Sequence, residues 1–229
     1  MKRFYKAVNV APGPGGVAIL LDGKPVKTPA RAPLAVPGER LAEAIAAEWQ
    51  GQGEAVDPRS MPLTGLANAA IDRVAPDRDA FARSLARYAE ADLLCYRAEA
   101  PQALVRRQAE AWDPLLAWAR RRFDVDFEVT AGVMHRPQPP RTVERLAELV
   151  LERGPFELAG LAPLVTVSGS LMIALALAEG AAPLEEAWSA ATLDEAWQAE
   201  HWGDDPLAAA AHDERRRDFD AGFLFLSLL

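Results

Sequence analysis

Cysteine is almost absent from this 229-residue chain. The single cysteine, Cys95, cannot form an internal disulfide, which predicts a reducing compartment. Its neighbours Leu93, Leu94 and Tyr96 are apolar or aromatic. We therefore expect Cys95 to be a small buried residue and not a nucleophile.

Histidine is also scarce, and its spacing defines no metal motif. The three histidines are His135, His201 and His212. No two of them stand four residues apart, and the HExxH pattern is absent. Glu200 and His201, close to Asp204 and Asp205, could hold a metal only with ligands from elsewhere in the chain. The glycine patterns of phosphate loops and nucleophile elbows are also missing. We predict no metal, no cofactor and no catalytic site.

Basic residues are outnumbered: 25 Lys and Arg stand against 33 Asp and Glu, giving a net charge of −8. Affinity for a phosphate backbone or an anionic lipid surface comes mainly from Lys and Arg, so the composition argues against nucleic acid and membrane partners. The two tight basic clusters, Arg120-Arg121-Arg122 and Arg215-Arg216-Arg217, are expected to be solvated helix faces.

One long stretch lacks charge, from Leu158 to Ala178, and it is about as long as a membrane-spanning helix. Pro163, Ser168 and Gly169 interrupt it, which favours two buried helices and predicts no membrane insertion. The N-terminal residues run directly into a strand pattern without the apolar core of a signal peptide. We therefore expect a bacterial cytoplasmic protein, although a processed organellar form would look similar.

The hydrophobic pattern changes once along the chain. Residues 3–36 alternate as strands, with turns at Gly13–Gly16 and Asp22-Gly23. From Pro37 onward the apolar spacing is helical, including one helix expected from Pro183 to about His201 and a last helix capped at Asp205-Pro206. Strands followed by helices indicate an α+β protein. We predict a small β-rich N-terminal domain at 1–60 and a larger all-helical domain, an orthogonal bundle, at 61–229.

The central helix is expected to begin at Pro101 and to carry two adjacent apolar stripes, so that neighbours can pack on two sides. Pro114 cannot donate a hydrogen bond to the carbonyl of Glu110. We therefore expect a kink at Asp113-Pro114, or a second helix that begins there.

Tryptophan and acidic residues gather near the C-terminus. Trp188, Trp197 and Trp202 fall close together, with the acidic residues Glu185, Glu186, Asp194, Glu195 and Glu200 just before or among them. Tryptophan is enriched in the residues that dominate binding energy at interfaces, although such rings also fill helical cores. The combination would suit a partner surface that is apolar with a basic rim.

Several blocks, in this order, resemble the F1-ATPase assembly chaperone family, whose members protect the alpha subunit of F-type ATP synthase. The resemblance covers nearly the whole length. It rests on Arg3-Phe4-Tyr5-Lys6, Leu21-Asp22-Gly23-Lys24, Lys27-Thr28-Pro29, Ala47-Glu48-Trp49, Met61-Pro62-Leu63-Thr64, Ala70-Ile71-Asp72-Arg73-Val74, Asp92-Leu93-Leu94-Cys95-Tyr96-Arg97, Trp112-Asp113-Pro114-Leu115-Leu116, Glu195, Gln198 and Trp202-Gly203.

The resemblance implies a β-containing N-terminal domain, a C-terminal helical bundle, no catalysis and no cofactor. It implies binding to the free alpha subunit, whose beta-facing surface would be shielded until the catalytic head assembles, with the gamma subunit involved in release. Eukaryotic relatives would act in the mitochondrial matrix. An unassembled subunit exposes a large apolar interface, which precipitates unless it is covered.

We predict that the client contacts Trp49, Glu195, Gln198, Glu200 and Trp202. Two alternatives remain open. One is a helical scaffold with a different client. The other is a metal-dependent enzyme using Glu200, His201 and Asp205.

Overall fold

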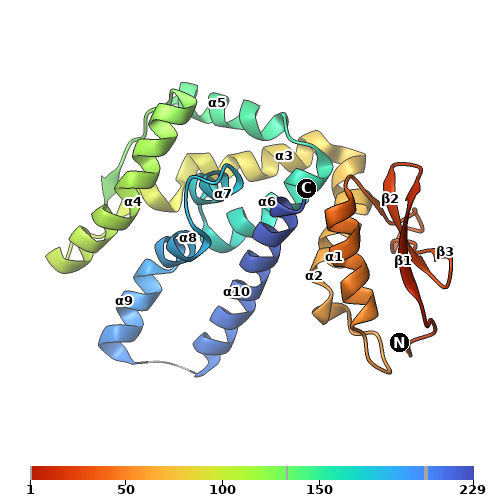
Figure 1. The fold of residues 1–229 in the computed structure, drawn as a ribbon. Helices are drawn as coiled ribbons and strands as arrows, with labels where there is room; N and C mark the ends of the chain where they lie inside the picture. The colour runs from red at the N-terminus through yellow and green to blue at the C-terminus, as the bar shows by residue number, and fades with distance from the viewer. Residues whose placement is uncertain (1, 133, 204–205) are drawn as a thin grey trace. The chain divides into compact units, whose positions relative to one another are not determined.

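The structure is a computed structural model that describes residues 2–132, 134–203 and 206–229 (Figure 1). Its contacts divide the chain into two compact units. The N-terminal unit contains residues 2–78 together with Gly154–Gly160 and Leu224–Leu229. The helical unit contains Asp79–Arg153 and Leu161–Phe223. Helices α6 and α10 each contribute residues to both units.

A small antiparallel sheet begins the N-terminal unit. Its strands are β1 (Val8–Gly13), β2 (Gly16–Leu21), β3 (Lys24–Pro25) and β4 (Ala35–Val36), with β2 paired to the other three. Asp22 and Gly23 both have positive φ, as the predicted hairpin turn between β2 and β3 requires. Gly16 is also required, because a Cβ there would lie 2.1 Å from the carbonyl oxygen of Val36.

Two helices and a returning segment complete the N-terminal core. Helix α1 (Glu39–Gln50) buries Leu41, Ala42 and Ile45, and α2 (Pro62–Ala69) begins at a proline. Phe225, near the C-terminus, is fully buried in the same cluster as these α1 residues. The unit is therefore assembled from both ends of the chain.

The helical unit is built from longer elements and several short turns. Its helices are α3 (Arg78–Ala86), α4 (Gln102–Phe123), α5 (Pro140–Leu151), α6 (Pro155–Ser168), α7 (Leu171–Ala178), α8 (Leu184–Ala191), α9 (Leu193–Trp202) and α10 (Pro206–Ser227). It also contains a short parallel ladder between β5 (Tyr96–Arg97) and β6 (Thr130–Ala131). The predicted all-helical domain therefore includes one short strand pair, which forms through parallel pairing that local sequence does not reveal.

Helix α4 settles one of the two outcomes expected at Pro114. It runs as one helix from Gln102 to Phe123 with Pro114 inside it, so no second helix begins at Asp113. Trp112, Leu116 and Ala119 are buried on this helix. Burial of that stripe holds the helix together across the one hydrogen bond that proline removes.

The uncharged stretch forms two helices, as predicted. Helix α6 ends at Ser168, and α7 begins after Ser170, whose hydroxyl caps it by accepting from the Ile173 N–H at 3.0 Å. Across the described ranges, no helix is both long enough and apolar enough to cross a membrane.

The prediction of a single helix from Pro183 to about His201 is wrong, because the chain forms two helices there. The chain forms α8 and α9 with a break at Thr192, whose hydroxyl donates to the Trp188 carbonyl at 2.9 Å. A threonine hydroxyl that bonds the carbonyl four residues earlier often bends a helix, which fits a break at this position. The predicted cap at Asp205 lies outside the described residues.

The α+β class predicted from the sequence is confirmed. The compact units do not coincide with the predicted division at residue 60. Residues 61–78 belong to the same compact unit as the N-terminal sheet, and so do two later segments of the chain. The boundary depends on long-range packing, which hydrophobic periodicity alone does not show.

Candidate partner-binding site

Helix α9 is held along two sides by polar contacts. Arg107 of α4 donates to both carboxylate oxygens of Glu200 at 2.8 Å. The buried Gln108 side chain donates to Asp194 at 2.7 Å. On the other side, Arg215 of α10 makes two hydrogen bonds to Glu195, one of them 2.8 Å long. These pairs position α9 between α4 and α10.

A groove of about 670 Å³ lies between α9 and α10; we call it the α9–α10 groove. Small side chains line much of it, including Ala196, Ala199, Ala208, Ala209 and Ala211. Trp202 also lines it, and its side chain is 78% exposed. Leu207, early in α10, is 81% exposed. Large apolar side chains this exposed near an alanine-lined groove are typical of a protein-binding surface.

Three of the predicted contact residues meet in this groove. Glu195, Gln198 and Trp202 all line it, because they follow one face of α9 at helical spacing. Glu195 and Gln198 are both exposed. The Arg215 guanidinium hydrogen-bonds to Glu195 and lowers the pKa of that carboxyl group. Glu195 therefore stays ionised while it fixes the wall of the groove.

The other two predicted residues lie elsewhere. Glu200 does not line the groove and is paired with Arg107 of α4. Trp49 belongs to the N-terminal unit, where its half-buried ring packs against the core and lies 5.7 Å from the Tyr5 ring. Its buried indole Nε1 has no hydrogen-bond partner among the described residues. Trp49 thus has a structural role in its own unit.

The metal alternative gains nothing from the structure. Asp204 and Asp205 lie outside the described residues. Within the described part of the chain, no group of three or more His, Cys, Asp or Glu side chains could hold a metal ion. The Nδ1 of His201 lies 2.8 Å from the Trp197 carbonyl, and its ring stacks on Trp197.

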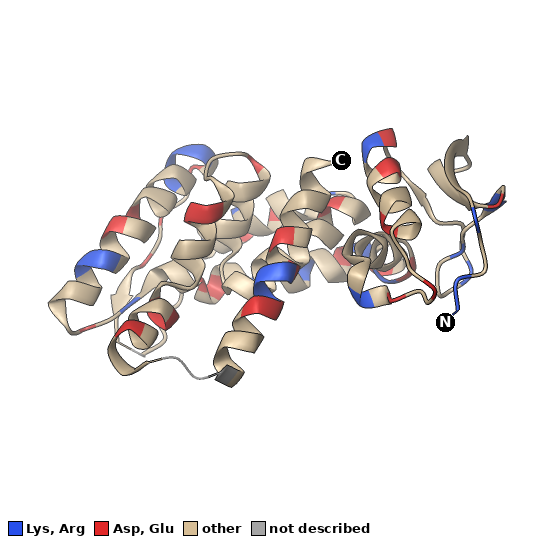
Figure 2. Ribbon diagram, turned by 60° about the horizontal axis from the view of Figure 1, so that its bottom comes forward, with Lys and Arg blue, Asp and Glu red and all other residues tan. Residues whose placement is uncertain are grey.

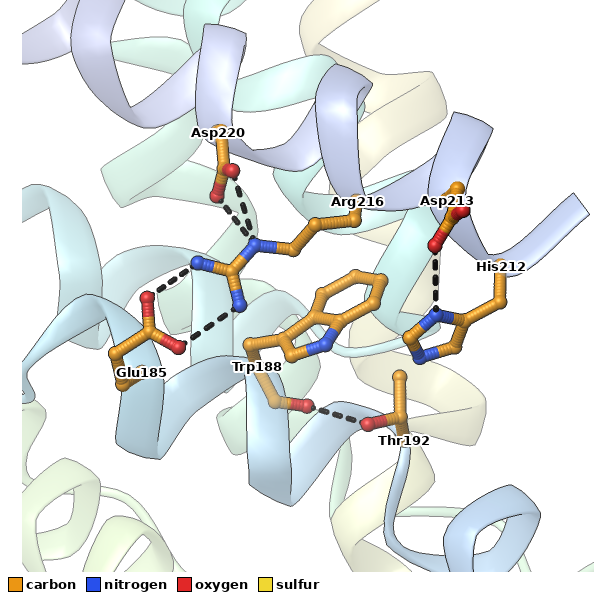
Figure 3. Close-up of polar contacts among 7 residues, drawn as sticks. All are labelled: Glu185, Trp188, Thr192, His212, Asp213, Arg216 and Asp220. Carbon is orange, nitrogen blue, oxygen red and sulfur yellow. Dashed lines mark hydrogen bonds and ion pairs between the residues drawn. The ribbon is translucent and has the colours of Figure 1, made fainter. Parts of the chain in front are cut away.

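The basic cluster at Arg215 and Arg216 is not the solvated face predicted from the sequence. Arg216 hydrogen-bonds to Glu185 of α8 and to Asp220, and its guanidinium lies 5.3 Å from the centre of the Trp188 ring. Figure 3 shows Trp188 between Arg216 and His212. The i,i+4 spacing of Arg216 and Asp220 was a signal for pairing. These contacts fasten α8 to α10.

The DLLCYR block also forms internal contacts. Asp92 is fully buried and accepts hydrogen bonds from the Leu94 N–H, the Ser170 hydroxyl and the Met172 N–H. Cys95 is buried as predicted, and desolvation raises the pKa of its thiol to about 12. A thiol with so high a pKa is not a nucleophile near neutral pH.

The WDPLL block connects this region to α8. The Trp112 indole donates to the Ala190 carbonyl at 2.8 Å, and Asp113 accepts from Arg97 at 2.8 Å. These two blocks of the family resemblance therefore hold helices of this unit together. The groove is lined by other residues of the resemblance, among them Glu195, Gln198 and Trp202.

Comparison with known proteins identifies the class. A family model described as ATP12 chaperone protein matches residues 2–120. The mitochondrial protein atp12 of Schizosaccharomyces pombe is 27% identical over 214 residues, covering 88% of this chain and 74% of its own length.

Solved structures agree with this result. The crystal structure of Atp12 from Paracoccus denitrificans superposes with a TM-score of 0.95 at 44% identity, covering 99% of this chain and 97% of that one. A variant of the P. denitrificans protein, in which lysine replaces an aspartate, gives a TM-score of 0.95 at 43% identity, with coverages of 99% and 97%.

The chain belongs to the ATP12 chaperone family. The resemblance to F1-ATPase assembly chaperones noted in the sequence is confirmed. The protein is accordingly a chaperone and not an enzyme, which rules out the metal-dependent alternative.

Proposed function

We propose that this chaperone acts in the assembly of F-type ATP synthase by binding the unassembled alpha subunit. It would shield the beta-facing interface of that subunit until the catalytic head forms, and the gamma subunit would take part in release. The expected location is the bacterial cytoplasm, with the mitochondrial matrix for eukaryotic relatives. No nucleic acid, membrane insertion or cofactor is required.

The α9–α10 groove is the observation that carries this proposal. A chaperone needs an exposed apolar surface that can be exchanged for the final partner, and the groove offers one beside the 78% exposed Trp202. Its walls are fixed by the Glu195–Arg215 pair, so little ordering is needed on binding. We propose that Glu195, Gln198 and Trp202 contact the client directly.

Glu200 and Trp49 remain proposed contact residues, but they are poorer probes. Changing Glu200 also breaks its pair with Arg107, and changing Trp49 also disturbs the N-terminal core. Charge reversal at Glu195 has the same defect, because a lysine there would face Arg215. Gln198 and Trp202 are exposed and can be changed with less structural effect.

The test is capture of isolated alpha subunit in the absence of ATP. Wild-type protein should keep the alpha subunit soluble and should not capture isolated beta subunit. The double variant Trp202→Ala with Gln198→Lys should bind roughly 30-fold more weakly, which is the effect of losing about 2 kcal/mol at an interface hot spot.

Phe4→Ala is the matched control, because Phe4 is also an exposed aromatic residue, 64% exposed, in the other unit. This variant should bind the alpha subunit as the wild type does. Failure of the wild-type protein to bind the alpha subunit would end the proposal. Capture of a different protein from lysate, without the alpha subunit, would favour the scaffold alternative.

A further inference from the structure

A second groove lies on the opposite side of α9, between α4 and α8; we call it the α4–α8 groove. Its volume is about 760 Å³. Ala111, Leu115 and Trp118 of α4 line one wall, and Ala187 and Ala190 of α8 line the other. The α4 residues fall on one stripe at steps of three and four, so the groove runs along the helix. The two grooves share Ala196 of α9.

The walls carry carboxylates that are not neutralised. Glu110 on α4 and Glu186 on α8 both line the groove and are exposed. Neither makes an ion pair with any residue in the described ranges. The arginine on the rim, Arg107, is already paired with Glu200. The groove thus offers an apolar floor between two uncompensated negative charges.

Pro114 also lines the groove. Because it has no N–H, it cannot donate to the Glu110 carbonyl as another residue at this helical position would. Arg216, which pairs with Glu185 of the α8 wall, is also bonded to Asp220. The groove is therefore suited to a partner that brings both apolar and positively charged groups.

We infer that the α4–α8 groove binds a basic amphipathic helix of the alpha subunit. The apolar stripe of that helix would lie over Leu115 and Trp118, with Lys or Arg side chains beside Glu110 and Glu186. This inference rests on the proposed function for the identity of the client. The charge and shape of the groove are the basis for inferring that the bound segment of the client is a basic amphipathic helix.

A helix suits the groove better than an extended strand does. Both walls are helices, whose backbone groups are bonded internally, so the groove has no strand edge with which an extended peptide could pair. A segment that enters an apolar groove must satisfy its own backbone groups, and a helix does so. The alanines at 111, 187 and 190 leave room for larger side chains from the partner.

The first test is charge reversal with a matched control. Glu110→Lys with Glu186→Lys should weaken capture of isolated alpha subunit at least about tenfold, because two attractive contacts become repulsive. Glu144→Lys with Glu152→Lys makes the same change in net charge at exposed positions of α5 and its C-cap. That control should stay within about twofold of wild type.

A second experiment uses a synthetic peptide to test binding to the groove without the alpha subunit. A Leu/Ala/Lys peptide of about 18 residues, patterned as an amphipathic helix, should bind the wild-type protein and gain helical circular dichroism. The Glu110→Lys/Glu186→Lys variant should lose this binding, while the control double variant keeps it. The same peptide with Glu in place of Lys should not bind.

The outcomes separate the two proposals. If wild-type protein captures the alpha subunit and the groove double variant captures it equally well, the inference is wrong and the proposed function stands. If wild-type protein ignores the alpha subunit, the proposed function fails. In that case, loss of peptide binding in the Glu110→Lys/Glu186→Lys variant alone would still support the groove as a site for a basic helix. Equal peptide binding by this variant and the Glu144→Lys/Glu152→Lys control would overturn that inference. Ser189→Trp, at an exposed position in the groove, should block both ligands and does not depend on charge.

Discussion

Asp92 is a fully buried ionisable side chain that links two segments of the helical unit. It is fully buried, and desolvation raises its pKa to about 6 despite hydrogen bonds from Ser170, Met172 and Leu94. The residue joins the DLLCYR segment to the start of α7. A carboxyl group in this position stabilises the fold most when it is protonated.

This raised pKa sets the direction of a pH effect. The folded pKa of about 6 exceeds the ordinary value of 3.8, so the folded state binds more protons between these values. The contribution of Asp92 to the free energy of unfolding is therefore greatest below pH 3.8 and is lost as the pH rises through about 6. A shift of about two units corresponds to roughly 3 kcal/mol at most.

Asp92→Asn should destabilise the protein by about 2 kcal/mol, because the amide nitrogen would face the Met172 N–H in place of an acceptor. Since asparagine does not titrate, the stability difference from wild type should shrink as the pH rises from about 4 to about 7. Urea denaturation at a series of pH values measures both effects. A difference that does not change with pH would contradict the assignment of the titration to Asp92.

Helix α9 is positioned by ion pairs that are largely exposed. The Arg107 and Glu200 side chains are 42% and 51% exposed, and those of Arg215 and Glu195 are 38% and 49% exposed. Exposed pairs contribute little to global stability because solvent screens them. Their main role is to orient the walls of the two grooves. Figure 2 shows acidic and basic positions spread along the helices and not collected in one patch.

Glu200→Gln should therefore change the free energy of unfolding by less than about 1 kcal/mol. Gln108→Ala should cost more, roughly 1–3 kcal/mol, because the buried Gln108 side chain bonds both Asp194 and the Ala98 N–H. Chemical denaturation of the two variants gives the comparison. A larger loss from Glu200→Gln than from Gln108→Ala would mean that the exposed pair carries the stability of α9.

At the scale of the whole molecule, the chain ends belong to one unit. Phe225 is fully buried in the N-terminal core with Ile19, Leu41 and Ile45, and its ring stacks on Phe156. Gly160 is also constrained there, because a Cβ would come within 2.8 Å of the Leu226 side chain. The N-terminal unit cannot be complete until the last residues of the chain are in place.

Phe225→Ala should consequently lower the free energy of unfolding by about 3–5 kcal/mol, as expected for an aromatic ring removed from a packed core. Leu224→Ala is the neighbouring control, because Leu224 is 47% exposed and should have little effect. Thermal and urea denaturation should be measured for both. Equal effects of the two variants would show that Phe225 does not belong to the core.

Local patterns predicted much of what the structure contains. The Asp22-Gly23 hairpin, the division of the uncharged stretch into two helices and the burial of Cys95 all follow from short stretches of sequence. The break at Thr192 was missed because a side-chain hydrogen bond to the preceding turn ends α8 without any proline or glycine. Pro114 was expected either to kink the central helix or to begin a second one, and the helix continues through it as a single element.

The candidate site was predicted only in part. Helical spacing placed Glu195, Gln198 and Trp202 on one face of α9. The second wall of their groove is formed by alanines of α10, and nothing in the sequence around these alanines indicates a binding surface. The partner of Glu200 is Arg107, 93 residues away along the chain. Periodicity gives the faces of a helix but does not say which other helix each face meets.

The sequence by itself determined the α+β class, the chaperone family and the absence of a disulfide, because these depend on composition, period and motif order. The tertiary structure alone decided that Phe225 completes the N-terminal core, that Asp92 bonds Ser170, and that grooves lie on both sides of α9. The physical reason is that burial and hydrogen bonding join residues far apart in the chain. Those pairings are fixed by how whole faces pack together, and local sequence does not specify them.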